Sequence, residues 1–172
     1  MYVNPSAYYL NQVLYEIPNA YSFIKGNMDY PKLEGIVRFY CVPNGTLLNA
    51  EIYNLPLSHD CAPNIFGFHI HEGASCTGNS QDPFADSGMH YNPDNCPHPA
   101  HAGDLPPLLN KEGFAWTLFL TGRFLVKDMI GKTIIIHSKP DDFKTQPAGN
   151  SGEKIACGEI LAASSNNIFD EI

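Results

Sequence analysis

The sequence is poor in basic residues and in long apolar runs. Its 172 residues include 10 Lys and Arg against 18 Asp and Glu, which gives a formal net charge of −8. No cluster of basic residues forms the positive stripe that a phosphate backbone requires, so nucleic acid is not expected as a partner. The longest apolar stretches, such as residues 114–120 and 133–136, are far shorter than the ~20 residues that span a bilayer. We therefore expect no membrane span.

Cysteine is present in a modest and odd number, and no secretory signal opens the chain. Residues 1–9 carry no basic segment followed by an apolar one, which predicts a cytoplasmic protein; an exported protein whose signal has been removed is the alternative. Five cysteines are too few for a small disulfide scaffold but suffice for one or two bridges and a free thiol. The cysteine count alone leaves the compartment open.

Helical periodicity is also missing, because glycine and proline, at 14 residues each, divide the chain into short segments. This pattern predicts a mostly β protein of one domain. We expect an N-terminal extension over residues 1–19, the domain over residues 20–163 and a C-terminal tail over residues 164–172. Seven short strands are expected at residues 20–25, 33–41, 46–55, 65–71, 114–121, 133–137 and 155–162.

Two connections between these strands carry specific signals. Asn44-Gly45 supplies the positive φ that a tight hairpin turn needs, so the second and third strands are expected to pair. Residues 73–110 are rich in Gly, Pro, Asn, Asp and His and show no strand pattern. A loop of this length in a compact domain is usually functional or disordered, and its histidines favour a functional loop.

Histidine provides the main indication of chemistry, and His69 and His71 form its first pair. They are two residues apart in a predicted strand, so both imidazoles lie on one face with their Cα atoms about 7 Å apart. Two nitrogens can then bind one metal ion. A His-x-His pair alone is weak evidence, since a strand can carry two exposed histidines by chance.

A second group lies in the long loop and consists of His90, His98, His101 and Asp104. Three imidazoles and one carboxylate fill a tetrahedral zinc shell, and the alternative is a polar loop that happens to be rich in histidine. His137 ends an apolar predicted strand. By itself it is more simply explained as a core histidine whose ring nitrogens are satisfied by hydrogen bonds.

The number of donors suggests that one ligand is shared. Two four-coordinate metals need eight ligand positions, whereas seven donors are available: His69, His71, His90, His98, His101, Asp104 and His137. One imidazole that bridges both metals closes the gap. An all-imidazole site beside a zinc site suits copper(II), which prefers a tetragonal arrangement of nitrogen ligands, so the second metal is expected to be redox-active. Spacing does not identify the bridging histidine.

These residues lie in motifs that resemble the copper/zinc superoxide dismutase family. The family motif Gly-Phe-His-x-His-Glu is matched at residues 67–72, and Gly-Met-His-Tyr-Asn-Pro occurs at residues 88–93. Further matches are the eight-residue step from His90 to His98, Gly-Asp-Leu-Pro at 103–106, Asp141 four residues after His137, Gly-Asn-Ser-Gly at 149–152 and Ala-Cys-Gly at 156–158. The resemblance covers residues 20–162 and points to the bacterial-type branch.

The resemblance implies an all-β fold, namely an eight-stranded Greek-key β-barrel of the immunoglobulin-like sandwich type with long metal-binding and electrostatic loops. The eighth strand is expected near residues 124–126. The resemblance assigns the two metals to overlapping ligand sets. Copper is bound by His69, His71, His90 and His137, and zinc by His90, His98, His101 and Asp104, with His90 as the bridge.

The resemblance also implies supporting roles. Asp141 becomes the carboxylate that links a copper ligand to a zinc ligand and fixes their orientation. Cys76 and Cys157 become the intramolecular disulfide, for which two free buried thiols are the alternative. The remaining cysteines gain no role: a second bridge between Cys61 and Cys96 and free thiols both stay open, and Cys41 has no assigned partner.

The sequence departs from the family pattern at two places. Lys154 stands where the family usually has an arginine that holds the anion above copper. Lysine keeps the charge but loses the planar two-pronged donor, so weaker substrate positioning is expected. Lys139, Lys144 and Lys154 are candidates for a positive funnel, with ordinary surface lysines as the alternative. Only two residues separate the implied zinc ligands His98 and His101, fewer than in most members.

The activity implied by the resemblance is dismutation of superoxide to oxygen and hydrogen peroxide. A redox-cycling copper bridged through histidine to a structural zinc would carry it, with His90 and Lys154 as catalytic residues. Superoxide is the implied substrate, and a homodimer is a possible assembly. The alternative is a non-catalytic relative that binds copper and zinc to buffer or store them; retention of all seven ligands disfavours it.

Overall fold

The protein is described here by a computed structural model covering residues 16–43, 45–57 and 64–163. Most of the expected N-terminal extension and the expected tail over 164–172 therefore lie outside the described residues. One sheet contains β1 (Ala20–Gly26), β2 (Glu34–Val42), β3 (Gly45–Tyr53), β5 (Phe68–His71), β7 (Ala115–Thr121), β8 (Thr133–His137), β9 (Lys154–Glu159) and β10 (Leu161–Ala162). A small second sheet pairs β4 (Ile65–Phe66) with β6 (Leu108–Leu109).

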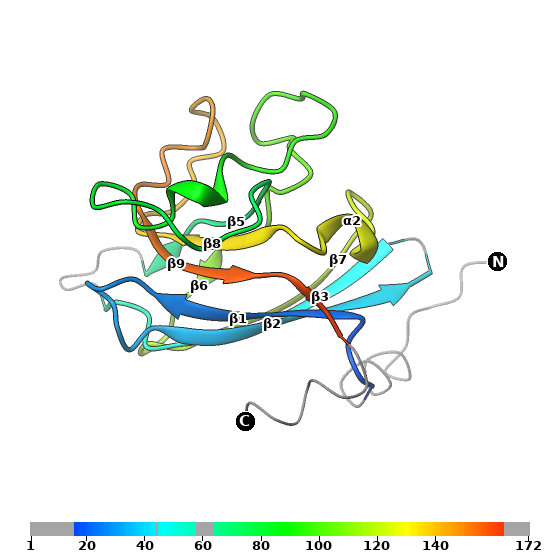
Figure 1. Cartoon of the computed structure of the whole chain (residues 1–172), viewed down its shortest axis with the longest axis horizontal. Helices are drawn as coiled ribbons and strands as arrows, with labels where there is room; N and C mark the ends of the chain where they lie inside the picture. The colour runs from blue at the N-terminus through cyan, green and yellow to red at the C-terminus, as the bar shows by residue number, and fades with distance from the viewer. Residues whose placement is uncertain (1–15, 44, 58–63, 164–172) are drawn as a thin grey trace.

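The large sheet is antiparallel and follows the order β5-β8-β9-β1-β2-β3-β7, with β10 paired to β1. β8 follows β7 in the chain but lies at the other end of the order, next to β5. Such a return across the sheet is the Greek-key pattern. The all-β prediction is therefore confirmed. The two long loops, one between β5 and β6 and the other between β8 and β9, lie together beside β5 and β8 (Figure 1).

The expected hairpin is present as β2 and β3. Their register runs from Glu34↔Tyr53 to Val42↔Gly45, so the connection is as short as a tight turn requires. Asn44 itself lies outside the described residues.

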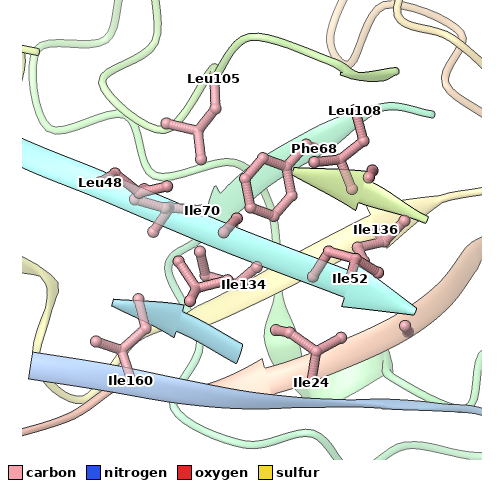
Figure 2. Close-up of a cluster of buried hydrophobic side chains, with 14 of the residues drawn as sticks. Ile24, Leu48, Ile52, Phe68, Ile70, Leu105, Leu108, Ile134, Ile136 and Ile160 are labelled. Atoms are coloured by element: carbon pink, nitrogen blue, oxygen red, sulfur yellow. The ribbon is translucent and has the colours of Figure 1, made fainter. Parts of the chain in front are cut away.

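β5 and β8 are buried on both faces, and this places the chemistry. Phe68 and Ile70 of β5, with Ile134 and Ile136 of β8, belong to the main hydrophobic core. Figure 2 shows these side chains gathered between strands from both ends of the sheet. Because side chains alternate between faces, the intervening residues of both strands face the opposite way, toward the long loops. His69, His71 and His137 are among those intervening residues.

The outer face of β8 carries a second, smaller core under one of the long loops. Ile135 packs there with Phe84 and Cys157, and Cys76 lies against them. The expected disulfide between Cys76 and Cys157 is formed and closes a sequence separation of 81 residues. It ties the loop after β5 to β9. Cys96 has a free thiol, as does Cys41, and Cys61 lies outside the described residues, so a second bridge finds no support.

Three expectations about local structure are wrong. Residues 124–126 form no strand; instead the helix α2 (Val126–Met129) begins there, because the Asp128 carboxylate accepts a hydrogen bond from the Leu125 N–H at 3.1 Å. The strand expected at 65–71 is divided into β4 and β5, which pair with different partners. The loop expected over 73–110 contains the short 3₁₀ helix η1 (Ala85–Ser87) and β6.

Among the residues described, no helix combines the length and the apolar character that crossing a membrane requires.

Candidate metal centre

Seven buried side chains meet in two groups that share one histidine. In each group, one ligand atom from every residue lies within 4.8 Å of the others. The first group consists of His69, His71, His90 and His137, and the second of His90, His98, His101 and Asp104. The structure thus brings together every residue that the sequence suggested as a metal ligand. The span of two residues between His98 and His101 does not prevent the second group from closing.

The loop ligands are placed by backbone pairing with β5. His90 pairs with His71 and Asp104 with His69 as isolated bridges. The Tyr91 N–H donates to the Ile70 carbonyl at 2.8 Å, while the Ile70 N–H donates to the Gly103 carbonyl at 2.9 Å. A Cβ at Gly103 would lie 2.3 Å from the Ile70 oxygen, so this close approach requires glycine.

In the first group, one nitrogen of each strand imidazole is used by the protein. His69 Nε2 lies 2.9 Å from Asp141 Oδ2, and His71 Nδ1 donates to the Gly88 carbonyl at 2.9 Å. His137 Nδ1 donates to the Gly152 carbonyl at 3.3 Å. These contacts fix the rings and leave the other nitrogen of each facing the middle of the group.

The inward nitrogens of the first group fit a metal ion. Within the described part of the chain, His69 Nδ1 and His90 Nε2 are buried without a hydrogen-bond partner, and His71 Nε2 lies 3.4 Å from His137 Nε2. Unpartnered buried nitrogens cost free energy unless something binds them. Four converging imidazole nitrogens are the donor set that copper(II) prefers.

The second group converges on one carboxylate. Asp104 Oδ1 lies 2.8 Å from His90 Nδ1 and 3.4 Å from His101 Nδ1, and its Oδ2 lies 3.1 Å from His98 Nδ1. Three imidazoles and one carboxylate suit a tetrahedral zinc ion. His90 therefore presents Nδ1 to this group and Nε2 to the first. His90 is the residue that the two groups share, which spacing in the sequence could not show.

Asp141 links the two groups through their outer nitrogens. Its Oδ2 accepts from His69 Nε2 and its Oδ1 from His98 Nε2, both at 2.9 Å. Burial raises the pKa of this carboxyl, but hydrogen bonds from His69, the Phe143 N–H and His98 outweigh it and lower the pKa to about 2. Asp141 is therefore ionised at neutral pH, as an acceptor from two imidazoles must be.

Burial also favours the neutral form of four of the ligand histidines. It lowers the pKa of His137 to about 3 and that of His71 well below its ordinary value, with neighbouring imidazoles adding to the effect. Burial likewise lowers the pKa of His69 and His101. The neutral ring is the form that binds a metal.

Lys154 lines a cavity of about 550 Å³ that reaches His71, His90 and His137. Its ammonium donates to the Asp82 carboxylate at 2.9 Å and to the Phe84 carbonyl at 3.1 Å. Asp82 could not be predicted as a partner of Lys154, because the two residues are 72 positions apart in the chain.

The three lysines expected to form a positive funnel, Lys139, Lys144 and Lys154, do not together line this cavity. Of those three, only Lys154 is found among the described residues that line it. Carboxylates line the cavity as well, namely Asp29, Asp82 and Glu153. The local charge at the cavity is therefore mixed.

Comparison with known proteins agrees with this geometry. Residues 33–160 match the family model described as copper/zinc superoxide dismutase. The chain is 32% identical over 149 residues to a Cu-Zn superoxide dismutase of Deinococcus radiodurans, covering 76% of this chain and 79% of that one. It is 34% identical over 142 residues to Cu-Zn superoxide dismutase 1 of Aquifex aeolicus, covering 68% and 73%.

A solved structure supports the fold. The Cu/Zn superoxide dismutase from Brucella abortus superposes with a TM-score of 0.67 at 24% identity, covering 81% of this chain and 98% of that chain. The expectation of a Greek-key β-barrel is thereby confirmed.

Neutral buried histidines predict acid sensitivity of the metal-free protein. The unfolded chain takes up protons below pH 6.5, whereas folded His137 does so only near pH 3. The unfolded state then binds more protons, so the free energy of unfolding falls as the pH drops from 6.5 toward 3, by on the order of 2 kcal/mol for His137 between pH 6.5 and 5. Urea unfolding of the metal-free protein at a series of pH values measures this loss.

A matched variant isolates the contribution of one ring. His137→Gln removes one titrating group, so the slope of unfolding free energy against pH should flatten by about one proton between pH 6.5 and 4. Equal slopes in the two proteins would show that His137 is not held neutral by burial.

Proposed function

The chain belongs to the copper/zinc superoxide dismutase family, and we propose on this premise that it converts two superoxide anions and two protons into oxygen and hydrogen peroxide with copper and zinc as cofactors. The observation that carries the proposal is the shared position of His90. Its Nδ1 faces the Asp104 group and its Nε2 faces the three strand imidazoles. A copper ion and a zinc ion held on opposite sides of one imidazole fit these two donor sets.

The bound metals, His90 and Lys154 have different roles in the proposed reaction. Bound copper supplies a one-electron redox couple, and zinc supplies a fixed positive charge beyond the shared ring. His90 lines the open cavity, and its Nε2, which has no hydrogen-bond partner among the described residues, is the ring atom at which a proton can be held near the reacting anion. Lys154 supplies the positive charge on the cavity wall that attracts the anion.

A relative that only binds metal is the alternative function. Such a protein has no need of an open cavity beside its copper ligands. Here the cavity reaches His71, His90 and His137, and all seven donors are buried and convergent. The catalytic function is therefore favoured.

The test is a metal-dependent assay. Protein loaded with copper and zinc and then dialysed should consume superoxide rapidly, whereas zinc-only protein should not, because only copper changes its oxidation state. Pulse radiolysis or a stopped-flow measurement of superoxide decay gives the rate, and elemental analysis gives the metal content. Slow decay with one copper bound per chain would instead establish a metal-storage protein.

Lys154 provides a sharper prediction about the cavity wall. Lys154→Arg should raise the second-order rate, because a guanidinium can satisfy Asp82 or Phe84 and still present further N–H groups to the anion. Lys154→Gln should lower the rate by roughly tenfold at low salt, since the local positive charge is lost.

Lys144→Gln is the matched control for charge, because Lys144 is exposed and is not among the residues that line the cavity. Its rate should stay close to that of the native protein. If Lys144→Gln and Lys154→Gln reduced the rate equally, overall charge rather than the cavity wall would control substrate arrival.

We further propose that the protein forms a homodimer and that it does not bind nucleic acid. The exposed apolar side chains of Trp116 and Leu120 on the edge strand β7 support an assembly contact. Sedimentation of native protein and of Trp116→Glu tests this: the dimer should dissociate in the variant, and a native monomer at ~10⁻⁴ M would reject the proposal.

We also propose the cytoplasmic location expected from the sequence, which cell fractionation tests.

A further inference from the structure

Backbone pairing with β5 holds the Asp104 end of the loop that carries His98, His101 and Asp104, and side chains from other parts of the chain hold the rest. Within the loop, the His101 N–H donates to Asp104 Oδ2 at 3.0 Å and the Asp104 N–H donates to the His101 carbonyl at 3.2 Å. The segment between His98 and Asp104 belongs to no named strand or helix. Pairing with β5 at Gly103 and Asp104 does not by itself explain how the backbone from His98 to His101 keeps its shape.

Gln146 fixes the backbone of His98. The His98 N–H donates to Gln146 Oε1 at 3.0 Å, and Gln146 Nε2 donates to the His98 carbonyl at 2.7 Å. One side-chain amide thus satisfies both polar groups of the His98 backbone, as an adjacent strand would. Since His98 Nε2 is also bonded to Asp141, the residue is held at its backbone and at its ring. The ring nitrogen that faces the second group is Nδ1.

Arg123 fixes the other end of the same loop. Its Nη1 donates to the carbonyls of Pro99, His101 and Asp104 at 3.3, 3.2 and 3.2 Å. Arg123 lies between β7 and α2, whereas Gln146 lies between β8 and β9, so the two side chains attach the loop to two different connections of the chain. Three carbonyl oxygens turned toward one cationic group leave the side chains of His101 and Asp104 directed to the metal group.

We propose that Gln146 and Arg123 are positioning residues for zinc. They hold the ligand backbone in its binding arrangement before the ion arrives, so that the loss of conformational freedom falls on folding rather than on zinc binding. Neither side chain is a ligand. The inference rests on the proposed assignment of the second group to zinc, and it adds two residues that the ligand motifs do not contain.

The test measures zinc affinity directly. The metal-free full-length protein and the variants Gln146→Leu and Arg123→Met are titrated with zinc against a chromogenic chelator. Each variant should bind zinc about 10- to 100-fold more weakly, the usual effect of losing an outer hydrogen-bond partner of a metal site. Lys144→Leu and Lys127→Met are the matched controls, because both lysines are exposed and lie in the same two segments. The controls should stay within about twofold of the native protein.

Two further readouts separate positioning from general stability. Cobalt(II) substituted for zinc has visible absorption bands that depend on its coordination geometry, and these bands should change in both variants and in neither control. Arg123→Lys keeps a cation with several donors, so its zinc affinity should lie between those of the native protein and Arg123→Met. Urea unfolding of each metal-free protein shows how far the loop variants affect folding.

The outcomes are distinguishable. Unchanged zinc affinity and cobalt spectra in Gln146→Leu and Arg123→Met, with tight binding in the native protein, would overturn the inference and leave the proposed function intact. A loss of unfolding free energy with unchanged cobalt spectra would assign these residues a purely structural role and would also overturn it. Absence of zinc binding by the native protein would reject the metal assignment of the second group itself.

Discussion

Buried imidazole nitrogens without protein partners are the constraint on which the arrangement of this molecule depends. Among the residues described, His69 Nδ1 and His90 Nε2 have no hydrogen-bond partner, and His98 Nδ1 and His101 Nδ1 face only the Asp104 carboxylate, at 3.1 and 3.4 Å. Each would be costly if left alone, and a domain of this size has only a small margin of stability to offset such costs. The same four nitrogens converge on two points, so bound metal turns a destabilising feature into a stabilising one. The fold and the metals are therefore interdependent.

The strand alternation of β5 and β8 explains how a hydrophobic scaffold can carry this polar centre. One face supplies Phe68 and Ile136 to the main core, while the opposite face supplies His69 and His137 to the metal centre. A sheet with one solvent-exposed face could not do this, because water would compete for the imidazole nitrogens. The long loops exclude that water, and their own backbones become ordered through pairing with β5 and through side chains such as Asp141.

The sequence was most informative where a period or a donor count constrains geometry. The two-residue spacing of His69 and His71 predicted a common face, and the count of seven donors predicted that one is shared. Long-range contacts were not accessible in this way: spacing could not single out His90 as the bridge or reveal that Gln146 contacts His98. Local competition explains the wrong strand at 124–126, since the Asp128 carboxylate closes a helical turn that apolar alternation cannot anticipate. The division of the strand expected at 65–71 falls at Gly67, where a Cβ would lie 2.9 Å from Ser151, a residue 84 positions away that spacing could not connect to it.

The disulfide contributes to the substrate side of the site as well as to the fold. Cys157 lies three residues after Lys154 on β9, and Cys76 anchors the loop that carries Asp82 and Phe84. Both hydrogen-bond partners of the Lys154 ammonium therefore belong to a segment that the disulfide ties to the strand of Lys154 itself. Phe84 packs against Cys157 in the small outer core, which fixes its carbonyl further. Although the net charge of the chain is −8, the Lys154 ammonium is kept at a defined place in the cavity wall. The disulfide and the buried ring of Phe84 hold the segment that carries its two hydrogen-bond partners. Local structure, rather than overall charge, decides how the cavity meets an anion.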